Sequence, residues 1–284
     1  MPVEPPIELP RTLGEAYGVL ASAPHRPIAG GTDVMVQITG ELGAPPDRMI
    51  DLSRLDDLRG IAVEGDALVL GALTTYTEIR RSALCREHLP ALVEAAATIG
   101  AAQIQNRGTI GGNAMNASPA GDTLPVLLAT DAVLVAGSAR GERAVAAADF
   151  WTAYRQTALS PDELLLRVRI PLVAGREVRF RKVGTRRAQA ISKVVLALGW
   201  REGADGAWTA VRLALGSVAD RPIRTRATEA VLEGARPTPD VAARAAESLS
   251  AEISPIDDVR STANYRRAVA GRVLHRLIRD AGGW

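Results

Sequence analysis

Residues 28–33 read IAGGTD and residues 106–122 read NRGTIGGNAMNASPAGD, and these two glycine-containing segments decide how the chain folds. The first segment continues a short apolar run that predicts a β-strand. The second is dense in Gly, Asn, Ser and Thr, yet it also contains Ile110, Ala114 and Met115. A solvated linker would contain fewer apolar residues and more charge, so we predict that the second segment lies inside the protein against something polar.

Paired glycines suit both segments to holding a phosphate group. Gly30 and Gly31 can turn through positive φ angles and aim successive backbone N–H groups into one concavity. The glycines of the second segment would let its backbone approach a ligand closely. Two such nests suit a pyrophosphate gripped from two sides, which FAD and nucleotide sugars both contain. The alternatives are a strand–turn–helix corner for the first segment and a buried structural loop for the second.

Neither segment matches the common phosphate-binding patterns. The chain contains no G-x-G-x-x-G and no G-x-x-x-x-G-K-[ST], so a Rossmann fold and a P-loop are both disfavoured.

The composition predicts a soluble globular protein with room for two domains, since 284 residues are 47% hydrophobic and 23% charged. With a formal net charge of +2 and no basic tail, nothing indicates a nucleic-acid partner. The single cysteine, Cys85, excludes an intrachain disulfide and an iron–sulfur cluster held by this chain alone. No zinc-ligand spacing is found, and neither a signal peptide nor a membrane span is expected, so a cytoplasmic location is predicted.

Periodicity predicts an α+β chain whose two domains meet near residue 174. In residues 1–174, with subdomains of about 1–55 and 56–174, we expect capping boxes at 12–15 and 75–78, helices at 12–23, 89–98 and 124–130, and a short helix or turn at 34–38. We also expect strands at 26–29, 49–52, 132–136 and 164–170, a hairpin at 61–70, and a helix start at Ser118 and Pro119. In residues 175–284 we expect a smaller α+β domain with antiparallel strands at 178–183, 191–201 and 207–215, followed by helices at 225–234, 240–249 and 261–281.

Several motifs, in the same order, resemble the FAD-binding subunits of molybdenum hydroxylases, a family that includes xanthine dehydrogenase and carbon monoxide dehydrogenase. They are AGGTD at 29–33, TIGGN at 109–113, ASPAGD at 117–122, KVGTRRAQAISKV at 182–194 and DVRSTANYRR at 258–267. The resemblance implies a two-subdomain FAD-binding domain of the vanillyl-alcohol-oxidase (PCMH) type, followed by a smaller α+β domain. Thr32 and Asp33 stand where the carbon monoxide type carries histidine and serine, so we predict a closer relation to the xanthine type.

The resemblance also implies which residues bind the cofactor. From the first segment these are Ile28, Ala29, Gly30, Gly31, Thr32 and Asp33, and from the second Thr109, Ile110, Gly111, Gly112, Asn113, Asn116 and Asp122. Ile99 would pack against the flavin ring, which Ala190 and Ile191 would approach from the C-terminal domain. Arg226 would be a basic residue near the cofactor. No side chain is expected to be catalytic, because the flavin carries the redox chemistry.

Partners follow from the same resemblance. Substrate would be hydroxylated on a large molybdopterin-binding subunit, and electrons would cross two [2Fe–2S] clusters of a small subunit to this flavin and then to NAD or another acceptor. A basic run, Arg176, Arg179, Arg181, Lys182, Arg186, Arg187 and Lys193, would be either a solvated strand face or a dock for NAD or an acidic partner. The alternatives are a stand-alone FAD oxidoreductase of the same fold and a cofactor-free assembly module.

Overall fold

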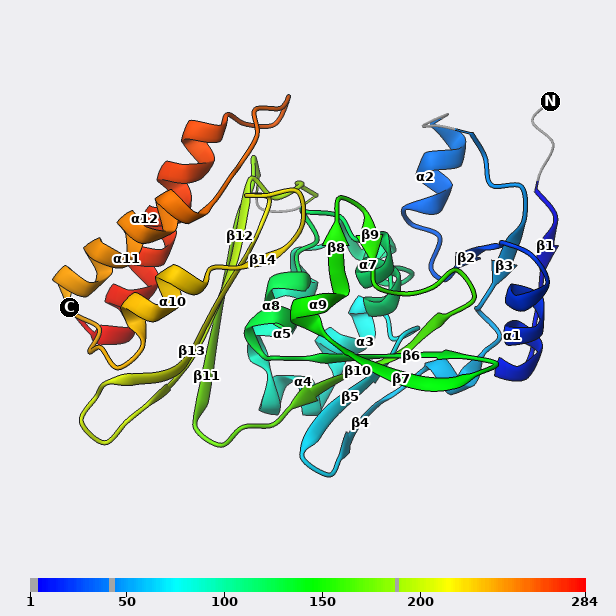
Figure 1. Cartoon of the computed structure of the whole chain (residues 1–284), viewed down its shortest axis with the longest axis horizontal. Helices are drawn as coiled ribbons and strands as arrows, with labels where there is room; N and C mark the ends of the chain where they lie inside the picture. Colours follow the sequence, from blue (N-terminus) through cyan, green and yellow to red (C-terminus); the bar gives the residue numbers. More distant parts are fainter. Residues whose placement is uncertain (1–4, 41–43, 187–188) are drawn as a thin grey trace.

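The computed structural model describes residues 5–40, 44–186 and 189–284. These residues form three sheet-based units that follow one another along the chain. The N-terminal unit lies at the right of Figure 1, the central unit in the middle and the C-terminal unit at the left.

The N-terminal unit is a small parallel sheet covered by a helix. Its strands are β1 (Ile7–Glu8), β3 (Met49–Asp51) and β2 (Arg26–Ile28), in the order β1-β3-β2. Helix α1 (Leu13–Ser22) is capped at its N-terminus by Thr12, whose Oγ1 accepts a hydrogen bond from the Glu15 amide at 3.2 Å. The predicted capping box is incomplete, because the Glu15 carboxylate accepts from the amide of Arg11 rather than of Thr12. Helix α2 (Val34–Thr39) directly follows the first glycine segment.

The central unit is a five-stranded sheet in the order β4-β5-β10-β6-β7. Its strands are β4 (Ile61–Glu64), β5 (Ala67–Gly71), β10 (Leu164–Pro171), β6 (Val133–Ser138) and β7 (Gly141–Ala146). The connections contain η1 (Asp56–Leu58), α3 (Tyr76–Arg81), α4 (Ala83–His88), α5 (Pro90–Ala97), α6 (Ala102–Gln105), α7 (Ile110–Asn116), α8 (Leu124–Ala129), α9 (Ala147–Phe150) and the short hairpin β8 (Trp151–Ala153) and β9 (Gln156–Thr157).

Strand β10 joins the central unit to the N-terminal one, because its first half is buried on both faces, whereas Arg167 and Arg169 in its second half are partly exposed. Leu164 and Leu166 pack with the core of the N-terminal unit, whereas Val168 and Ile170 pack with the helices of the central unit. An irregularity in the register between Leu165 and Arg167 accompanies this change of partners.

The C-terminal unit is an antiparallel sheet that carries its own helices on one face and packs against α5 and α8 of the central unit with the other. The strands β11 (Arg176–Val183), β12 (Val194–Glu202), β13 (Trp208–Gly216) and β14 (Ile223–Arg224) are followed by α10 (Arg226–Leu232), α11 (Pro239–Glu252) and α12 (Ala263–Gly282). Side chains alternate along β12 with the strand period: Val195 and Ala197 join the central core, and Leu196 and Leu198 join the core under α10 to α12. Figure 1 shows these three helices on the outer side of the sheet.

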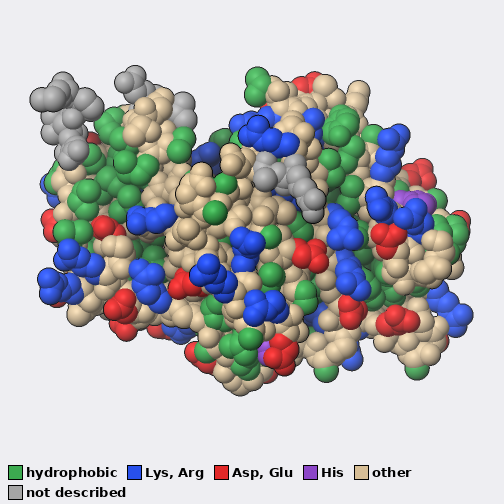
Figure 2. Space-filling model, turned by 180° about the vertical axis from the view of Figure 1, so that it is seen from behind, with side chains coloured by type: hydrophobic (Ala, Val, Ile, Leu, Met, Phe, Trp, Pro, Cys, Tyr) green, Lys and Arg blue, Asp and Glu red, His purple; other side chains and the backbone are tan. Residues whose placement is uncertain are grey.

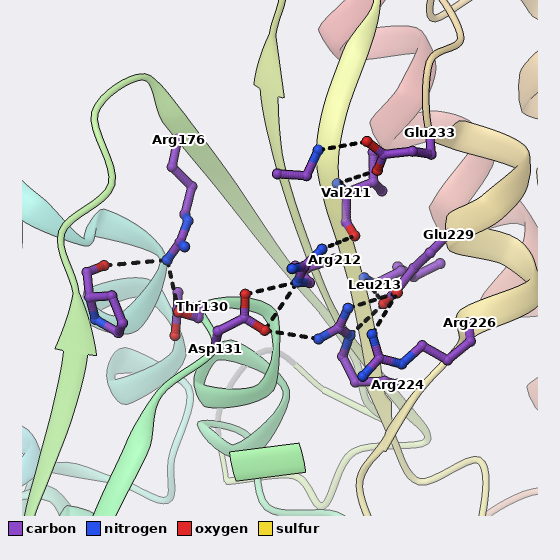
Figure 3. Close-up of polar contacts among 12 residues, drawn as sticks. Thr130, Asp131, Arg176, Val211, Arg212, Leu213, Arg224, Arg226, Glu229 and Glu233 are labelled. Carbon is purple, nitrogen blue, oxygen red and sulfur yellow. Dashed lines mark hydrogen bonds and ion pairs between the residues drawn. The ribbon is translucent and has the colours of Figure 1, made fainter. Parts of the chain in front are cut away.

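A charged network fastens the C-terminal unit to the turn after α8 (Figure 3). The carboxylate of Asp131 accepts hydrogen bonds from Arg212 Nε at 2.8 Å and from Arg224 Nη1 at 3.0 Å. Arg224, buried in the structure, also pairs with Glu229 of α10. Beside this network, Arg176 Nη1 donates to the Thr130 carbonyl at 2.8 Å.

The structure corrects several predicted elements. The second glycine segment is helical from Ile110 to Asn116, although glycine and asparagine disfavour helix, because its first turn is held by capping and by contacts with β5 and the turn that follows it. Ser118 and Pro119 start a turn instead, in which the Ser118 carbonyl accepts from the Gly121 amide at 3.0 Å. Strand β12 begins at Val194, so Ile191 precedes it, and the short fourth strand β14 was not anticipated.

Candidate functional site

A cleft of about 1520 Å³, counted out to its open mouth, opens between the N-terminal and central units. Its lining includes the first glycine segment, residues of the stretch from Ile99 to Asp122, and residues 190–191 of the C-terminal unit. Residues of β2, α3, β10 and the turn after β5 complete it. Figure 2 shows the surface notched between the N-terminal lobe at its left and the rest of the molecule. Clefts between units are common small-molecule sites.

The first glycine segment lines this cleft with backbone amides that lack protein partners. Within the described part of the chain, no acceptor is found for the N–H groups from Gly30 to Val34. Gly31 has φ +75°, in the left-handed region that favours glycine. Successive free amides around such a turn form the kind of concavity that binds anions.

Gly30 packs the first segment directly against the second. A Cβ at this position would overlap the carbonyl oxygen of Arg107, and it would lie 2.5 Å from the carbonyl carbon of Arg107 and 3.0 Å from the Gly108 nitrogen. Only glycine therefore allows the two backbones to lie in contact. The two glycine segments consequently face one cleft, as the sequence predicted.

The amides of the second segment are already used inside the protein, which corrects the expectation of a second free nest. The amide of Ile110 donates to the Thr74 carbonyl at 2.9 Å, and that of Gly111 donates to the Ala72 carbonyl at 2.9 Å. The Gly112 amide donates to Thr109 Oγ1 at 3.0 Å. A Cβ at Gly111 would lie 2.6 Å from the Ala72 carbonyl oxygen, so this glycine serves close packing of α7.

The second segment instead offers side chains to the cleft. Asn113 Oδ1 accepts from Thr123 Oγ1 at 2.8 Å, and no acceptor is found for Asn113 Nδ2 among the described residues. Tyr76, which also lines the cleft, has a buried hydroxyl without a hydrogen-bond partner in that same part of the chain. Burial raises the pKa of Tyr76 well above its ordinary value, so the phenol stays protonated.

A polar bridge closes one side of the cleft between the two units. Asn116 Nδ2 donates to Asp33 Oδ1 at 3.0 Å, and Asn116 Oδ1 accepts from Arg155 Nη1 at 3.2 Å. Asp33 belongs to the N-terminal unit, whereas the other two residues belong to the central one. The bridge therefore ties the first segment to the end of α7.

At the C-terminal side, Asp122 forms a buried cluster with Lys182. Lys182 Nζ lies 2.6 Å from Asp122 Oδ2 and donates to the Thr98 carbonyl at 3.0 Å. The Ser192 hydroxyl donates to Asp122 Oδ1, and Thr98 Oγ1 lies 3.4 Å from Asp122 Oδ2. Burial raises the pKa of Asp122, and the Lys182 ammonium and the two hydroxyls oppose that shift. The cluster joins the central and C-terminal units beside the cleft.

Most of the predicted binding residues meet in this cleft. The lining contains Ala29, Gly30, Gly31, Thr32, Asp33, Ile99, Thr109, Gly111, Gly112, Asn113, Asn116, Asp122, Ala190 and Ile191. Ile28 and Ile110 are absent from that lining: Ile28 ends β2, and Ile110 is fully buried in the central core. Arg226 also stands apart, because it is exposed at the start of α10 with Nη1 3.5 Å from Glu229 (Figure 3).

Sequence reasoning missed other residues of the lining, among them Arg26, Leu52, Tyr76, Ile104 and Leu165. They come from strands and short helices that carry no glycine motif. Tyr76 stands at the first position of a capped helix, but nothing in the sequence tied it to this cleft.

The basic run does not form one solvated face in the structure. Lys182 is buried against Asp122, Arg176 binds backbone carbonyls, and Arg181 lies 3.8 Å from Glu94. The ammonium of Lys193 lies 5.0 Å from the centre of the Tyr265 ring. Arg187 lies outside the described residues.

Comparison with known proteins identifies the family. Residues 4–173 match the family described as the FAD binding domain in molybdopterin dehydrogenase, and residues 179–281 match the CO dehydrogenase flavoprotein C-terminal domain. The carbon monoxide dehydrogenase medium chain of Hydrogenophaga pseudoflava is 30% identical over 96% of this chain and 95% of its own length. The xanthine dehydrogenase FAD-binding subunit of Escherichia coli O157:H7 is 31% identical over 96% of this chain and 95% of its own.

Solved structures agree with the sequence comparison. Reconstituted CO dehydrogenase from Oligotropha carboxidovorans superposes with a TM-score of 0.94 at 28% identity, covering 100% of this chain and 99% of that one. Quinoline 2-oxidoreductase from Pseudomonas putida 86 gives a TM-score of 0.92 at 27% identity, covering 99% and 98%. The chain belongs to the FAD-binding subunits of molybdenum hydroxylases and is the flavin subunit of an oxidoreductase. Its similar identities to the carbon monoxide and xanthine relatives do not separate those two types.

The residues of the cleft fit this cofactor. The free amides from Gly30 to Val34 suit a diphosphate, and the buried hydroxyl of Tyr76 is an unsatisfied polar group in the same wall. Apolar Ile99 and Ile191 suit the faces of a planar ring. In the residues described, no group of His, Cys, Asp and Glu is placed to hold a metal ion, and no helix is long and apolar enough to cross a membrane.

Proposed function

We propose that this chain holds FAD in the cleft and works as the electron-transfer subunit of a molybdenum hydroxylase assembly. In this proposal it takes electrons from the iron–sulfur clusters of a small partner subunit and passes them to NAD or another acceptor. A large molybdopterin-binding partner would carry substrate hydroxylation. The bound flavin supplies one- and two-electron transfer.

One observation carries the proposal: the run of unpaired amides from Gly30 to Val34 faces the same cleft as α7 and the segment at 190–191. Such amides bind a diphosphate without needing lysine. The names of the relatives add support for an assembly, because they are medium chains or subunits of larger enzymes.

The chain's own residues would bind and orient the cofactor rather than react. The first segment would hold the diphosphate, and the Asp33–Asn116–Arg155 bridge would keep the N-terminal unit closed over it. Ile99 and Ile191 would fix the ring by apolar contact. Ile191 remains 54% exposed, which leaves the ring side of the cleft open to a partner.

Three measurements test the proposal. Purified chain should be yellow, with about one FAD released per chain, since ligand clefts bury most of the surface of the ligand they hold. Affinity purification of the tagged chain from its native cells should recover a cysteine-rich small subunit and a large subunit. Anaerobically reduced assembly should then be reoxidised by NAD faster than by dioxygen or a quinone if NAD is the acceptor. Turnover of a small organic substrate by the chain alone would contradict the electron-transfer role.

A further inference from the structure

The cluster around Asp122 contacts both the central and the C-terminal unit, at the part of the cleft that residues 190–191 line. Its carboxylate binds Lys182 and Ser192, which belong to the C-terminal unit, and lies near Thr98 of the central unit. Thr98 immediately precedes Ile99, and Ser192 immediately follows Ile191. Ile99 and Ile191 both line the cleft. One carboxylate is thus connected to the two apolar residues expected beside the ring.

Both carboxylate oxygens of Asp122 accept hydrogen bonds from protein groups. Oδ2 accepts from Lys182 Nζ at 2.6 Å and lies 3.4 Å from the Thr98 hydroxyl, and Oδ1 accepts from the Ser192 hydroxyl. Side-chain exposure is 8% for Asp122 and 9% for Lys182. A charged pair this buried persists only when hydrogen bonds satisfy both ions. Asp122 therefore uses most of its acceptor capacity on protein donors, although it lines the cleft.

We propose that Asp122 and Lys182 are positioning residues that set the spacing between Ile99 and the Ala190–Ile191 segment, and so fix the flavin ring. The proposal rests on the proposed function for the identity of the ring. Lys182 adds to the same constraint, because its ammonium also holds the Thr98 carbonyl at 3.0 Å. The segment before β12 would otherwise be anchored to the central unit mainly through the Gln189 amide, which donates to the Gly100 carbonyl at 3.3 Å.

The test compares variants at two interdomain carboxylates. Asp122→Asn and Lys182→Met break the cluster beside the cleft, and Lys182→Arg retains the charge. Asp131→Asn is the control, because Asp131 also links the central and C-terminal units, through Arg212 and Arg224, but does not line the cleft. For the purified chain we would measure the FAD dissociation constant, the absorbance spectrum of the bound flavin and its midpoint potential.

The proposal expects Asp122→Asn and Lys182→Met to bind FAD roughly tenfold more weakly with an altered flavin spectrum, because small misplacements at a preorganised site are costly. Lys182→Arg and Asp131→Asn should stay within about threefold of the wild type. Combining Asp122→Asn with Lys182→Met removes both buried charges and should recover thermal stability relative to the singles. FAD affinity should remain low in that double variant, which a merely structural role would not produce.

Hydrogen exchange, together with FAD binding by the wild type, separates this inference from the proposed function. Ser192→Ala should loosen only the C-terminal side, so hydrogen exchange in apo protein should quicken at residues 189–193 and not at 98–100. Unchanged exchange, spectrum and affinity in Asp122→Asn would overturn the inference while FAD still binds the wild type. An equal change in Asp131→Asn would overturn it as well, because general domain coupling would then explain the effect. A wild-type chain that binds no FAD would instead overturn the proposed function.

Discussion

Replacing Gly30 with alanine should separate the two glycine segments and sharply weaken FAD binding. The added Cβ would overlap the Arg107 carbonyl oxygen and lie 2.5 Å from the carbonyl carbon, whereas ordinary contact begins at 3.4 Å. The backbones must therefore move apart by at least about 0.9 Å. The obstacle is backbone on both sides, which cannot rotate away as a side chain can. A misplacement of about 1 Å can lower the rate about 100-fold at a preorganised catalytic site. By analogy we expect the FAD dissociation constant to rise about 100-fold, which corresponds to about 2.8 kcal/mol.

The assay is fluorescence titration of deflavinated protein with FAD, with thermal unfolding of the same samples. Gly18→Ala is the matched control, because a Cβ at Gly18 of α1 meets no atom within 4 Å. That change should leave FAD affinity unaltered and stabilise the helix by about 0.5–1 kcal/mol. If Gly30→Ala binds FAD within threefold of the wild type, the close approach of the two segments does not shape the site.

Three other predictions follow from the cleft. Gly31→Ala should cost about 1–2 kcal/mol of folding stability through its φ of +75°, measured by urea unfolding, yet weaken FAD less than Gly30→Ala, because a Cβ there meets only side chains at 3.4 Å. Asn116→Ala should weaken FAD roughly tenfold by opening the bridge from Asp33 to Arg155, and an unchanged dissociation constant would rule out a role for that bridge. Arg143 lowers the pKa of Glu163 from its ordinary 4.5, so the pair stabilises the fold above pH 4.5, and that stability is lost as pH falls through the lowered pKa. In Glu163→Gln, urea unfolding at stepped pH should show a smaller loss of folding stability in acid than in the wild type. Parallel curves for the two proteins would contradict this.

The sequence was sufficient to predict that the two glycine segments meet. That prediction assumed two free nests around one ligand, but only the first segment keeps unpaired amides. Those amides follow from local geometry, because Gly30 and Gly31 follow a strand and precede a helix, and such a corner exposes amides whatever surrounds it. It was not sufficient to predict the role of Gly111, because the acceptor for its amide, Ala72, lies far away in sequence. Propensity alone favoured a loop there, and tertiary contacts produced α7 instead.

The pairing of charged residues was also beyond what the sequence could predict. The basic run looked like one strand face, but Lys182 turns inward to Asp122, which is sixty positions away in sequence. Arg226 was assigned by resemblance alone, and the structure places it at the charged network around Glu229 rather than at the cleft. Pairings of this kind depend on register and on how units pack, and periodicity does not encode either.

The most direct measurement of the central claim is a crystal structure of the chain with FAD bound. The diphosphate should lie within hydrogen-bond distance of amides between Gly30 and Val34, with the ring between Ile99 and Ile191. A diphosphate found elsewhere, with those amides facing solvent, would contradict the claim that this loop binds the cofactor.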